Sequence, residues 1–382
     1  MRIPKPVLLL SSGHFCVDMY SSMLAAFLPF LQDKLDLSLS QAGMLVGVLV
    51  FSSSLTQPVY GLLSDRFRSR AFVVLGPALA GLFISSLGLA PSFNSLLFLL
   101  FIAGVGIASY HPQGAALTHR HSERNPAFHM SIYVTAGTVG FALGPLYITS
   151  VIQHFGLPNS FWATIPGLLV SLFLYFHVPG PTSGPAHLEG RPSARLRTVL
   201  RPLLVLYTLV VLRSITHSGI ASFLPLYYIQ HGYSAYTANR FLTIFLFAGG
   251  ASGLAGGWLA SRFSGKKLLA FSFITSVPLF LAFLTSQGIW SVLFGSAGAA
   301  FLLLTNPLNV VMAQNLVPHG ASTIAALTMG FAWGMAGLLI PIIGSAIEIF
   351  GFESTFAVLT LLALPAFILT FLLPDEKAGD KH

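Results

Sequence analysis

The side chains best suited to chemistry are charged and ionisable groups that interrupt long apolar stretches. Asp18 follows His14 by four residues in the first stretch, and Arg213 precedes His217 by four residues in a later one. Four residues make about one helical turn, so the members of each pair lie on one helix face. A charge inside a membrane helix costs about 3 kcal/mol or more, which makes both pairs candidates for function.

Asp18 is the group that we expect to carry a proton. It lies about 16 Å along the first predicted helix, near the middle of a membrane, and no other carboxylate is predicted so deep. Burial favours the protonated form and a nearby arginine favours the carboxylate, and a proton switch needs this competition. We predict a proton-coupling group of Asp18, His14 and His111. The alternatives are a static Asp18–Arg213 pair, or a metal site of the same three residues. The lack of soft ligands disfavours that site, so no metal is predicted.

The predicted substrate site is organised around a cation. Arg213, with His217 and His111, is placed to attract an anionic group such as a phosphonate or carboxylate. Pro112 should kink its helix and turn His111 toward a cavity, and simple packing of His111 is the alternative. The other predicted substrate-binding residues are Gln113, Tyr20, Asn306 and Asn309.

Helices across a membrane are needed to position these groups. The chain has 382 residues, of which 54% are hydrophobic, and no soluble domain of this size could bury so much apolar surface. Apolar runs of about twenty residues, the length that spans a bilayer, can be placed twelve times. The predicted spans are residues 7–32, 41–63, 71–89, 94–118, 128–153, 160–177, 201–231, 237–260, 268–286, 289–315, 323–349 and 354–373. The sequence therefore predicts an all-α membrane protein.

The basic residues indicate how the chain is oriented. The net charge is +8, yet Lys and Arg gather in alternate loops, which argues against a nucleic-acid partner. Cytoplasmic loops are enriched in Lys and Arg, so this pattern predicts a multi-pass protein with both termini in the cytoplasm.

A charged loop between the second and third spans returns later in the chain. Gly61–Arg70 reads GLLSDRFRSR, and Gly257–Lys266 reads GWLASRFSGK. The same offset relates other prolines, namely Pro29 to Pro225 and Pro145 to Pro341. A repeat of this kind indicates two similar halves, as in many secondary transporters.

We therefore predict twelve transmembrane helices in two pseudo-symmetric six-helix bundles. The bundles are residues 1–177 and 200–382, the second with a short cytoplasmic tail, and a Pro-, Gly- and Ser-rich cytoplasmic linker joins them at 178–199. Polar contacts of the Gly61–Arg70 loop between the two bundles should hold the outward-facing state and break when the cytoplasmic side opens. The predicted gating residues are Gly61, Asp65, Arg66, Arg70 and Arg262.

The Gly61–Arg70 loop resembles the G-x-L-x-D-R-x-x-R-R motif of the major facilitator superfamily, with Ser69 at one basic position. With the repeat, the spans and the linker, the resemblance covers nearly the whole chain. It implies the major facilitator fold and transport by alternating access.

A narrower resemblance lies in residues 13–31, 37–66 and 106–116, which look like the fosmidomycin resistance protein family. The residues on that pattern are His14, Asp18, Gln57, Pro58, His111 and Pro112. The resemblance implies a bacterial inner-membrane exporter that is driven by protons.

One glycine pattern in the fifth span has a simpler meaning. Gly140-xxx-Gly144-Pro145 resembles part of the antiporter signature of the superfamily, but Ile148 and Thr149 replace its closing glycine pair. Small residues at this spacing predict close packing of two helices.

The predicted function is proton-coupled secondary transport, as an efflux antiporter of a small anionic drug or metabolite, and hence drug resistance. We expect a monomer without a cofactor in the bacterial inner (cytoplasmic) membrane. The alternatives are a proton-coupled uptake symporter of a small organic anion, a metal or siderophore transporter, and a sensor without flux. No nucleophile–base pair or HExxH motif favours an enzyme, so none is predicted.

Overall fold

The computed structural model describes residues 3–67, 70–122, 126–178, 196–260, 262–316 and 330–374, and within these residues all regular structure is helical. The first half contains α1 (Lys5–Leu35), α2 (Leu39–Val50), η1 (Phe51–Leu55), α3 (Gln57–Phe67), α4 (Ala71–Ser85), η2 (Ser86–Leu89), α5 (Phe93–Arg120), α6 (Pro126–Phe155), η3 (Leu157–Thr164) and α7 (Ile165–His177). The second half contains α8 (Leu196–Gln230), α9 (Ala235–Ala260), α10 (Gly265–Thr285), α11 (Gly288–Leu303), α12 (Asn306–Leu316), α14 (Ala332–Gly337), α15 (Ile340–Phe350), α16 (Phe352–Leu361) and α17 (Ala363–Thr370).

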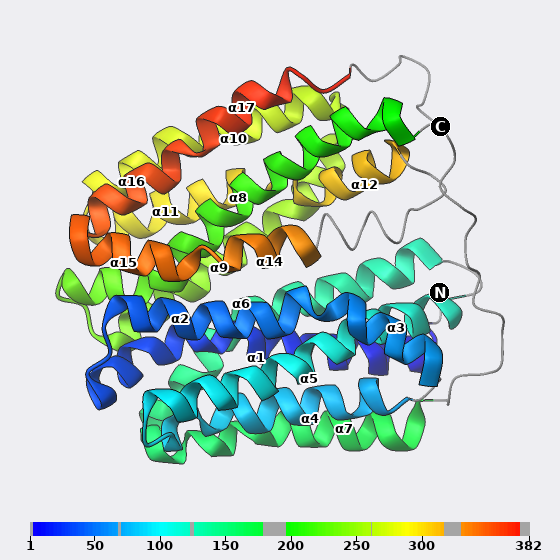
Figure 1. Cartoon of the computed structure of the whole chain (residues 1–382), viewed down its shortest axis with the longest axis vertical. Helices are drawn as coiled ribbons and strands as arrows, with labels where there is room; N and C mark the ends of the chain where they lie inside the picture. The colour runs from blue at the N-terminus through cyan, green and yellow to red at the C-terminus, as the bar shows by residue number, and fades with distance from the viewer. Residues whose placement is uncertain are drawn as a thin grey trace. The chain divides into compact units, whose positions relative to one another are not determined.

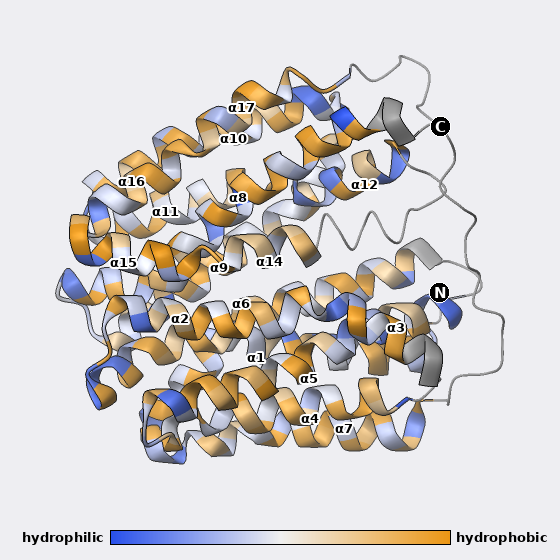
Figure 2. Cartoon of the chain, viewed as in Figure 1, coloured by the Kyte–Doolittle hydropathy of each residue, from blue (hydrophilic) through white to orange (hydrophobic). Residues whose placement is uncertain are grey.

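Twelve helical stretches within the described residues are long and apolar enough to cross a membrane. They follow the twelve predicted spans in order, so the predicted all-α membrane class is confirmed. The eleventh predicted span, 323–349, begins outside the described residues, and its described part is Ala332–Phe350. Figure 2 shows hydrophobic colour along most helices, with hydrophilic colour gathered toward helix ends and connections.

Short polar sequences set the starts of two spans. The Ser38 side chain accepts a hydrogen bond from the Gln41 N–H, and the Gln41 side chain accepts one from the Ser38 N–H. Ser92 and Ser95 form the same reciprocal pair at the start of α5. Such a pair satisfies N–H groups that the first turn of a helix leaves unpaired, which fixes where α2 and α5 begin.

The chain folds into two compact units. Unit 1 is Met1–Ala186 with Phe223–Thr243, and unit 2 is His187–Ser222 with Ile244–His382. The long helices α8 and α9 therefore contribute to both units. The predicted division into two bundles and a linker stays a prediction, and residues 179–195 of that linker lie outside the described residues.

In unit 1, α1 packs along α6 and also contacts α4, α5 and α7 (Figure 1). Gly140 and Gly144 of α6 lie so close to α1 that an added Cβ would collide with the carbonyl oxygens of Phe15 and Met19. The close packing predicted from the glycine spacing is confirmed. It holds α6 directly against the turn of α1 that carries Asp18.

In unit 2, α10 packs against α11, α16 and α17. The Ser272 hydroxyl of α10 donates to the Phe301 carbonyl of α11, and Phe283 of α10 stacks with Phe356 of α16 at a centroid distance of 6.4 Å. The neighbouring Phe273 ring faces the guanidinium of Arg213 on α8. Phe273 of α10 thus forms part of the buried surroundings of Arg213.

Candidate functional site

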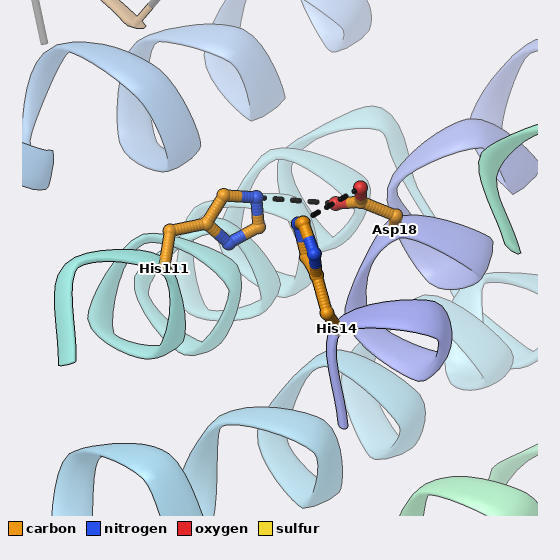
Figure 3. Close-up of side chains that lie close together, drawn as sticks. All are labelled: His14, Asp18 and His111. Atoms are coloured by element: carbon orange, nitrogen blue, oxygen red, sulfur yellow. Dashed lines mark ion pairs between the residues drawn. The ribbon is translucent and has the colours of Figure 1, made fainter. Parts of the chain in front are cut away.

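His14, Asp18 and His111 come together inside unit 1. α1 supplies His14 and Asp18, and α5 supplies His111 beside Pro112. Asp18 Oδ2 lies 3.3 Å from His14 Nε2, and Asp18 Oδ1 lies 3.1 Å from His111 Nε2. Figure 3 shows both rings directed at the carboxylate. The three residues predicted for proton coupling thus form one cluster, and their role in transport stays a prediction.

The contact of the second ring nitrogen of His14 fixes the tautomer of the neutral ring. Nδ1 is 2.8 Å from the Tyr133 carbonyl oxygen, and a carbonyl only accepts hydrogen bonds, so Nδ1 carries a hydrogen. Neutral histidine has one N–H, which leaves Nε2 with a bare lone pair facing Asp18. An ionised carboxylate beside that lone pair needs a cation between them. A single proton, on His14 or on Asp18, satisfies the contact.

Helix α6 shapes one side of the cluster. The Tyr133 ring stacks on the His14 ring with centroids 4.1 Å apart. One turn later, an added Cβ at Gly137 would lie 2.5 Å from Asp18 Oδ2 and 2.7 Å from His14 Nε2. Glycine at this position therefore leaves the space that the His14–Asp18 contact occupies. Gly137 was not predicted as a site residue, although it lies three residues before Gly140 on the same glycine-rich helix.

The cluster is enclosed but not sealed. The side chains of His14, Asp18 and His111 are 11%, 18% and 24% exposed. The adjacent Tyr110 donates its hydroxyl to the Leu10 carbonyl, which joins α5 to α1 next to the cluster. Partial exposure allows a proton to reach the carboxylate, while the packing keeps the three side chains close.

The same three side chains also have the composition and spacing of a cation site. One possible donor atom from each lies within 4.8 Å of the others. Two imidazoles and a carboxylate suit a divalent transition metal as well as a proton. The expectation that no metal binds here stays a prediction.

Arg213 is buried in unit 2 with unused hydrogen-bond donors. The residue is 1% exposed, and its Nη2 donates to Thr305 Oγ1 at 2.6 Å. Its guanidinium carbon lies 4.9 Å from the centroid of the Phe273 ring. Nε and Nη1 have no hydrogen-bond partner within the described part of the chain. A buried cation that keeps two donors free suits an anionic group.

Two further predicted substrate residues of unit 2 are buried in the same way. His217, one turn after Arg213, lies 5.4 Å from the Phe245 ring and 5.6 Å from the Trp333 ring. Neither ring nitrogen of His217 and neither amide atom of Asn309 has a partner among the residues described. Unit 2 therefore holds a group of buried polar side chains that a polar solute could satisfy.

Three other predicted substrate-binding residues have different surroundings. Gln113 accepts a hydrogen bond from the Val73 N–H at 2.8 Å, in the first turn of α4. Tyr20 donates to the Ala163 carbonyl at 2.7 Å and accepts from a backbone N–H of α7 at 3.0 Å. Asn306 is half-buried at the start of α12. Gln113 and Tyr20 thus join helices in this structure, and substrate contact by all three stays a prediction.

The predicted gating residues lie around the connection after α3 and around its repeat. The side chains of Asp65 and Arg66 lie outside the described residues. Gly61 is half-buried in α3. Arg262 is exposed, and its guanidinium carbon lies 4.0 Å from the centroid of the Trp258 ring. Their gating role stays a prediction.

Arg70 and Lys266, which the sequence repeat pairs, make equivalent contacts. Arg70 Nη1 donates to the Val178 carbonyl at 2.9 Å, and Lys266 Nζ donates to the Leu373 carbonyl at 3.0 Å. Each acceptor lies just after the end of a helix, α7 or α17, where a cation stabilises unpaired carbonyls. Each half thus ties the connection between its second and third spans to the end of its last span.

The sequence is similar to known transporters over most of its length. The sequence model of the Major Facilitator Superfamily matches residues 10–339. The Fosmidomycin resistance protein of Escherichia coli (strain K12) is 28% identical, with 97% of this chain and 93% of that protein covered. The uncharacterized MFS-type transporter YfnC of Bacillus subtilis (strain 168) is 27% identical over the same shares of the two chains.

One solved structure has a closely similar fold. It is a bacterial homolog of the human lysosomal transporter Spinster in an inward-facing and occupied conformation. The two structures superimpose with a TM-score of 0.80, 16% sequence identity and coverage of 96% of each chain. This similarity concerns the fold alone.

Proposed function

The chain belongs to the Major Facilitator Superfamily, and from this premise we propose that it is a proton-coupled antiporter that exports a small organic anion. Members of the family are membrane transporters and not enzymes, so the candidate groups serve binding and conformational coupling. The observation that carries the proposal is the contact between His14 Nε2 and Asp18, which a bound proton completes.

Proton binding belongs to unit 1. Asp18 contacts both His14 and His111, so one proton can be shared among a carboxylate and two imidazoles. Loss of that proton leaves a bare lone pair of His14 next to a negative charge. The cluster therefore favours different arrangements in its protonated and deprotonated forms, which is what coupling to a conformational change needs.

Anion binding belongs to unit 2. Arg213 offers two donors without partners, and His217 and Asn309 add further buried polar atoms. A carboxylate or phosphonate would satisfy these donors with charge-assisted hydrogen bonds. Proton and substrate thus have separate groups. Exchange results when each ligand stabilises an opposite-facing state of the transporter.

Similarity and charge support the proposed direction of transport and the proposed location. The relative in Escherichia coli is named for resistance to fosmidomycin, which supports export as the physiological direction. The Lys and Arg residues of alternate loops support cytoplasmic termini in a bacterial inner membrane. Asp65, Arg66, Arg70 and Arg262 are proposed to gate the cytoplasmic side.

The test uses the purified protein in liposomes that contain a pH-sensitive dye. A thermal-shift screen of small carboxylates and phosphonates first identifies a solute that binds. Addition of that solute outside should then release protons from the lumen if the protein is an antiporter. Proton entry together with the solute would identify a symporter, and solute flux without any proton movement would contradict proton coupling.

A further inference from the structure

The hairpin of α5 and α6 holds buried polar atoms that the proposed function leaves unused. His111 Nδ1, Thr118 Oγ1, His129 Nδ1 and the Tyr133 hydroxyl are buried without a hydrogen-bond partner among the residues described. Thr118, His129 and Tyr133 are each more than nine-tenths buried. Buried polar groups are normally satisfied, and an unsatisfied one costs about 1–3 kcal/mol.

One contact fixes how the two helices face each other. An added Cβ at Gly114 of α5 would lie 2.6 Å from the Tyr133 hydroxyl of α6. The helices are consecutive, and the short connection at residues 121–125 joins them, so they run in opposite directions. One turn nearer that connection, Thr118 on α5 is therefore level with His129 on α6.

The same alignment leads inward to the Asp18 cluster. One turn away from the connection, α5 presents His111 and α6 presents Gly137. His111 contacts Asp18 directly, and Gly137 borders Asp18 and His14. The unpaired atoms thus occupy successive levels, about 6 Å apart along the helices, from the carboxylate to the connection.

Water is the partner that fits such atoms. Buried waters bind where several polar groups would otherwise lack partners, and a gap of about 6 Å is bridged by one or two of them. The neighbouring Tyr110 is different, because its hydroxyl already donates to the Leu10 carbonyl. The series therefore runs through His111, Tyr133, Thr118 and His129.

We propose that these four side chains, bridged by water, form a proton path between Asp18 and the C-terminal end of α5. A proton that leaves Asp18 passes to a bridging water. The Tyr133 and Thr118 hydroxyls each accept one hydrogen and give up their own to the next water. His129 takes a proton at Nδ1 and releases the one on Nε2 to water at the end of α5. Only O–H and N–H bonds are exchanged. The path rests on the proposed function, and on the proposed orientation it opens to the cytoplasm.

The experiment removes the polar atoms while keeping the shapes of the side chains. Thr118→Val, Tyr133→Phe and His129→Leu are made singly and together, and proton movement is followed with a dye after solute addition to liposomes. The path predicts that the combined variant moves protons at least about tenfold more slowly than wild type. Solute affinity should stay within about twofold of wild type, because none of the three residues belongs to the anion site. Tyr133→Phe keeps the stacking on His14 and the backbone carbonyl that His14 contacts.

Tyr207→Phe and Thr164→Val are matched controls, because each removes a buried hydroxyl that also lacks a partner, outside the hairpin. They should move protons at the wild-type rate. Wild-type proton rates in the folded single and combined hairpin variants would overturn the path and leave the proposed function intact. Slow proton movement in the two control variants as well, or loss of solute binding in the hairpin variants, would also overturn it. Absence of proton movement in the wild type would overturn the proposed function and the path together. If the combined variant does not fold, the proton rates of the folded single variants decide the proposal by the same comparison with wild type.

Discussion

The His14 ring lies between two oxygen acceptors, one facing each of its ring nitrogens. The Tyr133 carbonyl, 2.8 Å from Nδ1, fixes a hydrogen on that nitrogen. The Asp18 carboxylate, 3.3 Å from Nε2, then needs a proton in the gap. Because the first hydrogen bond is to the backbone, it holds the ring whatever the charge of Asp18. The ring would therefore keep the same orientation with and without a proton on Asp18.

Arg213→Ala should weaken the binding of an anionic solute by about ten- to a hundredfold, since a hydrogen bond to a charged group contributes about 1.5–3 kcal/mol. Titration calorimetry on the purified protein measures this affinity. Arg201→Ala is the control, because Arg201 is an exposed arginine of the same helix and the same unit. Equal affinity in wild type and Arg213→Ala would leave Arg213 with a structural role beside Thr305.

At this scale the sequence indicated which ionisable side chains could act together, but not the contacts that position them. Asp18 and His14 were predicted to share a face because their spacing is one turn of a single helix. The second contact of Asp18, with His111, joins α1 to α5 and depends on how those helices pack. The Tyr133 carbonyl and the Thr305 hydroxyl could not be found at all, because every residue has a carbonyl and threonine is common in membrane helices.

The packing of α6 on α1 positions the cluster and leaves no room for a side chain at residue 137 of α6. Gly137→Ala places a methyl carbon 2.5 Å from Asp18 Oδ2, so the His14–Asp18 contact has to open. We expect a several-fold loss of gradient-driven transport with solute affinity unchanged, measured in liposomes and by calorimetry.

Gly257→Ala controls for the loss of a helical glycine, since an added Cβ there meets nothing within 4 Å. It should transport like wild type. Full gradient-driven transport in Gly137→Ala would mean that the His14–Asp18 contact is not required for coupling.

Substitution of Tyr20 tests whether this predicted substrate-binding residue stabilises helix packing instead. Its hydroxyl bridges the Ala163 carbonyl and an N–H of α7, so Tyr20→Phe should lower the free energy of unfolding by about 1–3 kcal/mol. Thermal stability in detergent should fall while solute affinity stays the same. The opposite pattern, lower affinity at unchanged stability, would support substrate contact by Tyr20.

The predicted spans were confirmed because length and apolar composition alone decide which helices can cross a membrane. Local helix geometry and side-chain hydrogen bonds within the spans depend instead on which helices pack together. Phe51–Leu55 forms a π-helical turn within the second span, and nothing in its sequence FSSSL distinguishes it from ordinary helix. Gln113 was expected to face a cavity but bonds the Val73 N–H, because the start of α4 leaves that donor unpaired.

Across the whole molecule, the sequence repeat has a physical counterpart in Arg70 and Lys266. Arg70→Ala removes the hydrogen bond to the Val178 carbonyl and the contact with the Tyr175 ring at 5.2 Å. We expect turnover to fall several-fold with little change in affinity, because these contacts of Arg70 are with the end of α7 and not with a candidate binding group. Arg240→Ala, an exposed arginine outside the tie, should behave like wild type.

Transport assays at saturating solute separate turnover from affinity for these variants. A fall in affinity at normal turnover would contradict a gating role for Arg70. The pairing of Arg70 with Lys266 could be predicted from the repeat. The grouping of Phe223–Thr243 with unit 1 could not, because sequence similarity does not say which helix ends pack together.

The central claim is that Asp18 carries the coupled proton, and Asp18→Asn in liposomes tests it most directly. The amide keeps the size of the side chain and removes its titration. Binding of the solute and exchange of labelled for unlabelled solute should remain, while flux driven by a pH gradient should disappear. Gradient-driven flux that persists in Asp18→Asn would contradict the claim and move the proton site to His14 or His111.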